Sequence, residues 1–266
     1  MLFTNETYQT LRADAADKIL VLPLGATEQH GPHLATGTDS DIVTSIAQMA
    51  EQLRSEKIVL APTLPFGSSH HHLDFGGTIS IAPELYVKLI CDLVRSLVQS
   101  GYRRIVLLNG HGGNITPVKQ ALSVLSREFD ATTPSYFALA TYWELAGTTF
   151  SGDAPMQSPA LSHACEYETS MMLHLYPEKV WMNRVQRANR PAQNGYIAFE
   201  DDIPYKGISI VKQTPFISNN GCSGAPQLAS SEKGNHLIGT AVNALLQFLD
   251  SFSEWPLLTN LKNTDC

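Results

Sequence analysis

Three short apolar runs in the first half of the chain constrain its fold most strongly, because each is followed by a helical pattern. The runs occupy residues 18–24, 57–62 and 104–108. They are rich in branched side chains and end near proline, glycine or asparagine, as buried strands do. Helices are expected at residues 42–53, 83–99 and 115–129. Strands that alternate with helices form a parallel sheet with right-handed crossovers, so the sequence predicts an α/β fold.

The second half of the chain continues this pattern less regularly. A fourth strand is expected at residues 135–144, a further helix from His163, and a closing helix at residues 231–252. Residues 147–161 are rich in glycine, proline and serine, which predicts a loop or lid. Residues 183–215 mix glycine, proline and charge, and we interpret them as a surface excursion, with an oligomer contact and an arm over a neighbour's pocket as the two alternatives.

Length and composition favour a single domain. The chain has 266 residues, 43% of them hydrophobic, and we expect one domain over residues 1–266. A net charge of −7 argues against a nucleic-acid partner, because such proteins usually carry a basic face. No secretory pattern opens the sequence, and no apolar run reaches the roughly 20 residues that cross a membrane. We therefore expect a cytoplasmic protein without a membrane partner, whose four cysteines are free thiols.

The loop after the first strand carries Glu28, His30 and Asp39. Open α/β sheets bind their ligands at this carboxyl end of the strands. Glu28 and His30 are two residues apart, so in extended backbone their side chains project to the same side. Carboxylates and imidazoles together bind zinc, manganese or non-haem iron; the oxygens favour manganese and the nitrogens favour zinc. The alternative is a polar loop that only caps the following helix.

Two further strand-end loops contain histidines. Residues 70–72 are three successive histidines, and because neighbouring side chains point in different directions, at most two of them share a target. Exposed or supporting roles are the alternative for each of them. His111 lies between glycines after the third strand, and small neighbours let backbone and metal approach closely. A structural histidine is the alternative there, although its place in a third strand-end loop favours function.

Two features follow the fourth strand. Trp143 lies at its expected carboxyl end and either lines a pocket or packs in the core. His163 and Glu166 are three residues apart, so on a helix they share one face, whereas Glu168 points elsewhere. One helix face is therefore expected to present both an imidazole and a carboxylate.

Three segments resemble the signatures of the creatininase (creatinine amidohydrolase) family. They are Gly-Ala-Thr-Glu-Gln-His-Gly-Pro-His at residues 25–33 with Asp39, Asn-Gly-His-Gly-Gly-Asn at 109–114, and His-Ala-Cys-Glu-Tyr-Glu-Thr-Ser at 163–170. Weaker similarity at residues 75–78, 221–226 and 233–234 extends the resemblance over nearly the whole chain. It implies a three-layer α/β/α sandwich with a mostly parallel central sheet, a two-metal site and assembly into homohexamers. It also implies hydrolysis of non-peptide C–N bonds in cyclic amides and formamides.

The resemblance assigns metal-binding roles to individual residues. Glu28 and His111 match the terminal ligands of one metal. His30 matches a ligand of the other metal, and Asp39 matches the carboxylate that bridges the two. The implied cofactor is a pair of divalent ions, with zinc preferred and manganese or iron(II) as alternatives.

The second metal lacks one ligand in this comparison. In creatininase proper, its remaining carboxylate stands two residues after the histidine of the glycine-flanked motif, where this chain has Gly113. We expect Glu166 to supply that carboxylate, as in the formamide-hydrolysing branch of the family, and Glu168 to orient a ligand or a backbone turn. His163 matches the histidine that moves protons beside the metals.

The remaining predicted site residues are His33, expected to support the ligands, and His72 and Trp143, expected to contact a small-molecule substrate. The expected reaction is attack of hydroxide on an amide carbonyl, with His163 protonating the leaving nitrogen. Trp143 matches one of two aromatic residues that hold creatinine, but Pro159 stands in place of the other, which favours a formamide or another cyclic amide. Alternatives are a peptidase of the same family that acts in maturation of a peptide-derived cofactor, and a non-catalytic metal-binding scaffold.

Overall fold

The computed structural model describes residues 1–130, 132–188 and 211–258. Its centre is a sheet with the strand order β2-β1-β3-β4, in which all neighbouring strands are parallel. The strands are β1 (Ile19–Leu24), β2 (Ile58–Leu60), β3 (Arg104–Asn109) and β4 (Tyr136–Thr141). Every residue of β1 is buried, because helices cover both faces of the sheet.

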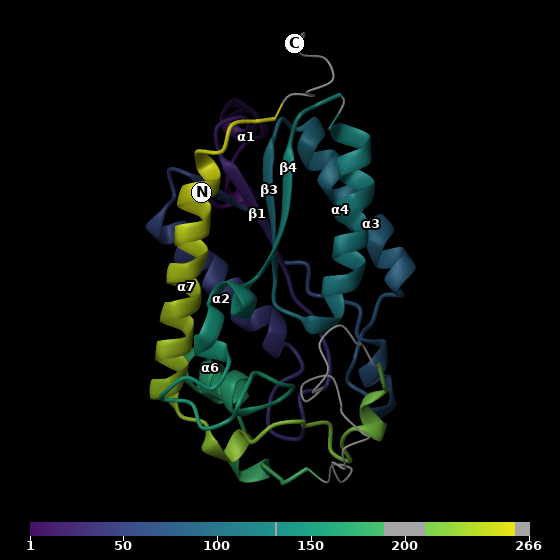
Figure 1. Ribbon diagram of the computed structural model, residues 1–266, viewed down its shortest axis with the longest axis vertical. Helices are drawn as coiled ribbons and strands as arrows, with labels where there is room; N and C mark the ends of the chain where they lie inside the picture. The colour runs from purple at the N-terminus through teal and green to yellow at the C-terminus, as the bar shows by residue number, and fades with distance from the viewer. Residues whose placement is uncertain (131, 189–210, 259–266) are drawn as a thin grey trace.

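Two helix layers enclose the sheet (Figure 1). One face is covered by α3 (Pro83–Gln99) and α4 (Ile115–Phe129), and the other by α2 (Thr38–Leu53), α6 (Glu166–Leu175) and α7 (Ser231–Ser253). Alternate residues of β1 belong to different cores: Ile19 packs with α2 and α7, and Leu20 packs with α3 and α4. This arrangement confirms the predicted three-layer α/β/α sandwich.

Shorter helices connect these layers. The remaining α-helices are α1 (Tyr8–Asp14) and α5 (Tyr142–Leu145). The 3-10 helices are η1 (Phe3–Asn5), η2 (His70–Phe75), η3 (Gly112–Asn114), η4 (Gly147–Phe150), η5 (Pro177–Lys179), η6 (Met182–Arg184), η7 (Thr214–Phe216) and η8 (Pro226–Leu228).

Two predicted elements differ from the structure. β4 ends at Thr141 and α5 begins at Tyr142, so Trp143 lies on a helix and not at a strand end. α6 begins at Glu166 because Ala164 adopts a left-handed backbone (φ 50°) and Cys165 is extended. His163 therefore precedes the helix, and the predicted helix face shared by His163 and Glu166 is wrong.

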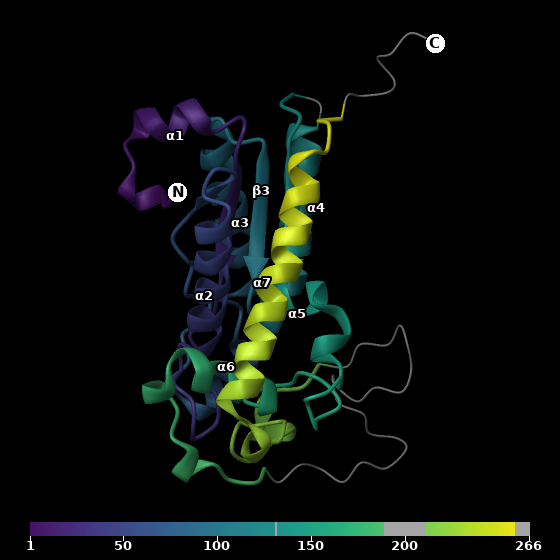
Figure 2. The same ribbon diagram turned by 90° about the vertical axis from the view of Figure 1, so that its left-hand side faces the viewer.

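Because all four strands are parallel, their carboxyl ends lie at the same edge of the sheet, and β3 points downward to that edge in Figure 2. The N-terminal halves of α6 and α7 pack together near the same edge (Figure 2). Most of the predicted surface excursion, residues 189–210, lies outside the described residues. Within the described part of the chain, no helix combines the length and the apolar character that crossing a membrane requires.

Candidate metal centre

Side chains from separate segments converge at the carboxyl edge of the sheet. The loop after β1 supplies Glu28 and His30, the first turn of α2 supplies Asp39, and the loop after β3 supplies His111. Their candidate ligand atoms, together with those of η2 and the α6 region, form four overlapping groups of three residues. Within each group, the ligand atoms lie within 4.8 Å of one another. This ligand cluster consists of Glu28, His30, Asp39, His71, His72, His111, His163 and Glu168.

Asp39 lies at the centre of the ligand cluster, between two imidazoles. Its Oδ1 is 3.1 Å from Nε2 of His30, and its Oδ2 is 3.1 Å from Nδ1 of His111. The first turn of a helix favours a carboxylate, because the backbone N–H groups there are unpaired. One carboxylate thus faces both halves of the cluster, which suits a ligand shared by two cations.

Two carboxylate oxygens in this cluster, Glu28 Oε2 and Asp39 Oδ2, are buried and have no hydrogen-bond partner among the described residues. Nitrogens of His111 lie 3.3 Å from the first and 3.1 Å from the second, without hydrogen-bond geometry. Buried polar atoms are normally paired, because an unpaired one has lost its hydration without replacement. A cation between these carboxylates and imidazoles would satisfy both oxygens, so the residues fit a divalent metal.

The electrostatics of the cluster depend on burial and on close opposite charges. Burial raises the pKa of Glu28 to about 7. Burial opposes protonation of the two central histidines, but carboxylates outweigh it: Asp39 raises the pKa of His30 well above its usual value, and Glu28 raises that of His111 to about 9. Burial disfavours the Asp39 carboxylate, yet His30 and His111 hold its pKa below the usual value. The cluster therefore holds negative charge that requires cations, either imidazolium or metal.

The other histidines of the cluster are neutral at pH 7. Burial lowers the pKa of His72 to about 2 and that of His71 to about 4. Burial, followed by the neighbouring imidazoles of His72 and His30, holds the pKa of His163 well below its usual value. Neutral imidazoles keep a free lone pair, which a metal ligand or a proton acceptor needs.

Glu166 does not face the ligand cluster, so the prediction that it is a metal ligand is wrong. Its buried carboxylate accepts hydrogen bonds from Lys233 Nζ and from the backbone N–H groups of Gln157 and Ser158. These contacts join α6 to the start of α7 and to the 147–161 loop. Glu168 is the acid of this helix that joins the cluster, and its Oε1 lies 3.8 Å from Nε2 of His30.

The other predicted site residues, His163, His33 and Trp143, lie in three different surroundings. The ring of His163 lies between those of His30 and His72, with centroid distances of 4.3 and 4.1 Å. His33 hydrogen-bonds through Nε2 to Thr169 Oγ1 at 2.9 Å, which connects the first loop to α6. Trp143 packs against Tyr142 and the core beside α7, as in the core alternative for this residue.

Sequence reasoning did not single out His71 or Gln29. η2 brings His71 into one group of ligand atoms with Glu28 and His111, whereas the exposed His70 hydrogen-bonds to Ser80. The Gln29 amide contacts the rings of both His72 and His163. Their positions in the sequence could have indicated both residues, since each is adjacent to a predicted site residue.

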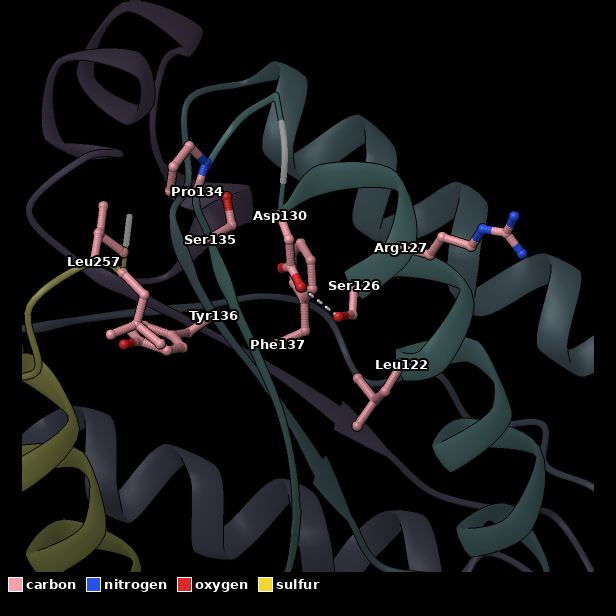
Figure 3. A pocket seen from close by; sticks show the side chains of 10 residues that line it. Leu122, Ser126, Arg127, Asp130, Pro134, Ser135, Tyr136, Phe137 and Leu257 are labelled. Carbon is pink, nitrogen blue, oxygen red and sulfur yellow. Dashed lines mark hydrogen bonds between the residues drawn. The ribbon is translucent and has the colours of Figure 1, made fainter. Parts of the chain in front are cut away.

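A cavity of about 550 Å³ lies at the opposite, amino-terminal edge of the sheet (Figure 3). α4, the start of β4 and residues 257–258 line it. Its acid, Asp130, accepts a hydrogen bond from Ser126 at 2.6 Å. The groups of metal-ligand atoms found among the described residues are all at the other edge, so we place the functional site there.

Comparison with known proteins identifies the family of this chain. The family model for creatininase, described as creatinine amidohydrolase, matches residues 4–249. The chain belongs to the creatininase family. It is 32% identical over 232 residues to the mycofactocin precursor peptide peptidase of Mycobacterium tuberculosis, with 84% of this chain and 81% of that protein covered. It is 30% identical over 196 residues to the creatinine amidohydrolase of Pseudomonas putida, with 65% and 70% covered.

Among solved structures, a manganese form of creatininase has a TM-score of 0.80 at 23% identity, with 96% of this chain and 99% of that chain covered. This likeness shows that the creatininase fold extends over nearly all of the chain. The curated creatininase-family relatives are hydrolases, an amidohydrolase and a peptidase among them, and this chain is a hydrolase of the same family.

The departure of this chain from the family pattern at Gly113 has a structural reason. A side chain at that position would overlap the carbonyl oxygen of Ser68 and Nε2 of His111. The backbone after β2 thus fills the space beside His111. The acid found near His30 comes from α6 instead, in the form of Glu168.

Proposed function

We propose that this creatininase-family hydrolase holds two divalent cations and cleaves a C–N bond in a small cyclic amide or formamide. The observation that carries the proposal is the position of Asp39, whose two oxygens face His30 on one side and His111 on the other. Glu28 lies beside His111 and Glu168 beside His30, so each side has its own imidazole and carboxylate.

These residues define two cation positions. The first consists of Glu28, Asp39 and His111, and the second of His30, Asp39 and Glu168. Mixed oxygen and nitrogen donors suit zinc, with manganese or iron(II) as alternatives. When bound, such ions polarise an amide carbonyl and lower the pKa of a water molecule.

The protein's own histidines move the protons of this reaction. His163 is neutral, and its Nδ1 lies 3.6 Å from Oε1 of Glu28. It takes a proton from the attacking water and delivers it to the nitrogen of the C–N bond, which breaks to give a carboxylic acid and a neutral amine. General acid and base catalysis of this kind contributes about 10²–10⁴-fold to the rate.

The side chains around the cluster favour a formamide or another cyclic amide over creatinine. We assign substrate contact to His72, whose Nε2 is 3.4 Å from Oε1 of Glu28. The half-buried Trp143 packs against Tyr142 and the core, and Pro159 occupies the position of the second expected aromatic residue. We further propose a cytoplasmic homo-oligomer, a hexamer by analogy with the family.

A peptidase is the second candidate. The M. tuberculosis relative named as a peptidase is 32% identical to this chain and covers 84% of it, against 30% and 65% for the P. putida amidohydrolase. Peptide hydrolysis needs the same polarised carbonyl and the same proton transfers. The two candidates therefore differ in substrate length and not in the groups that act.

Two measurements on the purified protein test these proposals. Metal analysis with two ions per chain supports the two-cation site, whereas one ion or none overturns it and favours a scaffold. The zinc- and manganese-loaded forms are then incubated with creatinine, formamidopyrimidines, small lactams and short peptides. Hydrolysis of a formamide or lactam supports the first proposal, cleavage of peptides alone replaces it with the second, and a fully loaded protein inert toward all of them overturns both.

A further inference from the structure

The side chain of Gln29 lies between two histidines of the ligand cluster, and its orientation is fixed by backbone groups. Its Oε1 accepts a hydrogen bond from the N–H of Gly31 at 2.9 Å. Its Nε2 lies 3.2 Å from the carbonyl oxygen of Gly221. A backbone N–H only donates and a carbonyl only accepts, so the amide has one consistent orientation. A side chain at Gly221, which has φ 83°, would overlap this amide.

The tautomer of His163 is set by the backbone of Gln29. Its Nε2 lies 2.7 Å from the carbonyl oxygen of Gln29, which can only accept. Nε2 of His163 therefore carries the hydrogen, and Nδ1 is left bare. That bare nitrogen is the one that lies 3.6 Å from Oε1 of Glu28, on the side of the ligand cluster.

The ring of His72 receives the opposite tautomer from the Gln29 side chain. Nε2 of Gln29 lies 2.7 Å from Nδ1 of His72 and donates to it, since its other hydrogen is directed to Gly221. The hydroxyl of Thr214 is 2.9 Å from the same ring nitrogen. Nδ1 of His72 is thus an acceptor, and Nε2 carries the hydrogen toward Oε1 of Glu28 at 3.4 Å.

The reverse assignment conflicts with the two shortest distances. With a hydrogen on Nδ1 of His72, two N–H groups would face each other at 2.7 Å between His72 and Gln29. With a bare Nε2 on His163, two lone pairs would face each other at 2.7 Å from the Gln29 carbonyl. Nε2 of Gln29 and Nε2 of His163 are 2.9 Å apart, and in this arrangement both carry hydrogens. The hydrogens of Gln29 point to His72 and Gly221, and that of His163 points to the Gln29 carbonyl oxygen.

We propose that Gln29 is a positioning residue that fixes opposite tautomers in two neighbouring histidines, leaving a bare nitrogen of His163 and an N–H of His72 directed at Glu28 and the ligand cluster. This inference deepens the proposed function and rests on it for its catalytic meaning. His163 then begins the reaction as the proton acceptor. His72 is a hydrogen-bond donor to Glu28 or to a substrate oxygen, and not a metal ligand.

The test reads the tautomers directly in the zinc-loaded protein labelled with ¹⁵N-histidine, by long-range ¹H–¹⁵N correlation without substrate. We expect hydrogen on Nε2 of both His72 and His163. In Gln29→Glu the new carboxylate only accepts, so the hydrogen of His72 should move to Nδ1. In Gln29→Met, which has a similar size and no donor, His72 should show a mixture of tautomers. The exposed Gln120→Glu is the matched control and should change neither ring.

Activity and metal content give a second readout. We expect Gln29→Glu and Gln29→Met to lower kcat at least tenfold, with a smaller change in KM and with metal content maintained. A hydrogen on Nδ1 of His72 in the unsubstituted protein, or an unchanged His72 tautomer in both variants, would overturn the inference. Because the tautomers are read without substrate, a failure of the proposed hydrolysis is distinguishable from a failure of this inference.

Discussion

The carboxylate of Glu168 lies 3.8 Å from Nε2 of His30, so the first turn of α6 reaches the loop that follows β1. Glu166, on the same turn, is bound instead by Lys233. We expect Glu168→Gln to remove one of the two proposed metal ions, since a neutral amide oxygen is a weaker ligand than a carboxylate. Metal analysis and metal titration of the purified variant measure this.

Glu166→Gln is the matched control for that experiment. It should keep both metals and lose stability, about 3–5 kcal/mol in the free energy of unfolding, because Lys233 loses its buried partner. Urea unfolding measures this loss. Normal metal content in Glu168→Gln, together with reduced metal content in Glu166→Gln, would contradict the structure and restore Glu166 as the ligand.

His163→Ala should keep its metals and lose activity. The ring lies beside the carboxylates of the cluster, and its removal takes away the proton acceptor while both sets of ligands around Asp39 stay in place. We expect kcat to fall about 100-fold or more. His70→Ala, at an exposed position, should leave kcat unchanged. A loss of metal from His163→Ala would show that this histidine is a ligand instead.

Gly113→Ala should disturb metal binding through His111. An added methyl group would overlap Nε2 of His111 and the carbonyl of Ser68, so the imidazole must move. We expect about 10–100-fold weaker metal binding, measured by competition with a chelating dye. At the adjacent Gly112 a methyl group meets no atom within 4 Å, so Gly112→Ala should bind metal normally. Equal affinities for the two variants would show that the site tolerates the overlap.

Tyr86→Phe should make the protein more resistant to alkali. The Tyr86 hydroxyl is buried without a hydrogen-bond partner among the described residues, and burial raises the pKa of its phenol above the usual 10.0. A raised folded-state pKa means that stability is complete below about pH 10 and is lost as the pH rises further. Phenylalanine has no phenol to ionise. Above pH 10 the free energy of unfolding of Tyr86→Phe should therefore exceed that of the unsubstituted protein by a growing amount. Near neutral pH the two should agree within about 1 kcal/mol.

Tyr8→Phe, at an exposed tyrosine, controls for that experiment. Its urea midpoint should follow that of the unsubstituted protein from pH 8 to pH 11. If the stability of Tyr86→Phe fell with rising pH as steeply as that of the unsubstituted protein, the alkali-sensitive group would be another residue.

The sequence by itself determined the sheet and the edge at which the cluster lies. Short branched runs that alternate with helical patterns predict a parallel sheet covered by helices on both faces, and parallel strands bring their carboxyl ends to one edge. Glu28, His30 and His111 follow such strands closely and Asp39 begins the next helix, so their convergence required no knowledge of distant contacts. The resemblance in their motifs indicated the family independently of this reasoning.

Only the tertiary structure decided which acid of α6 approaches His30. Spacing on an assumed helix favoured Glu166, but the left-handed backbone of Ala164 ends that regularity before the helix begins. Lys233, from the start of α7, then holds the carboxylate of Glu166, whereas the backbone N–H of Ala164 donates to the carboxylate of Glu168. The tautomers of His72 and His163 likewise depend on backbone groups from separate loops. Such contacts have no local pattern, because they form between segments that only the complete fold brings together.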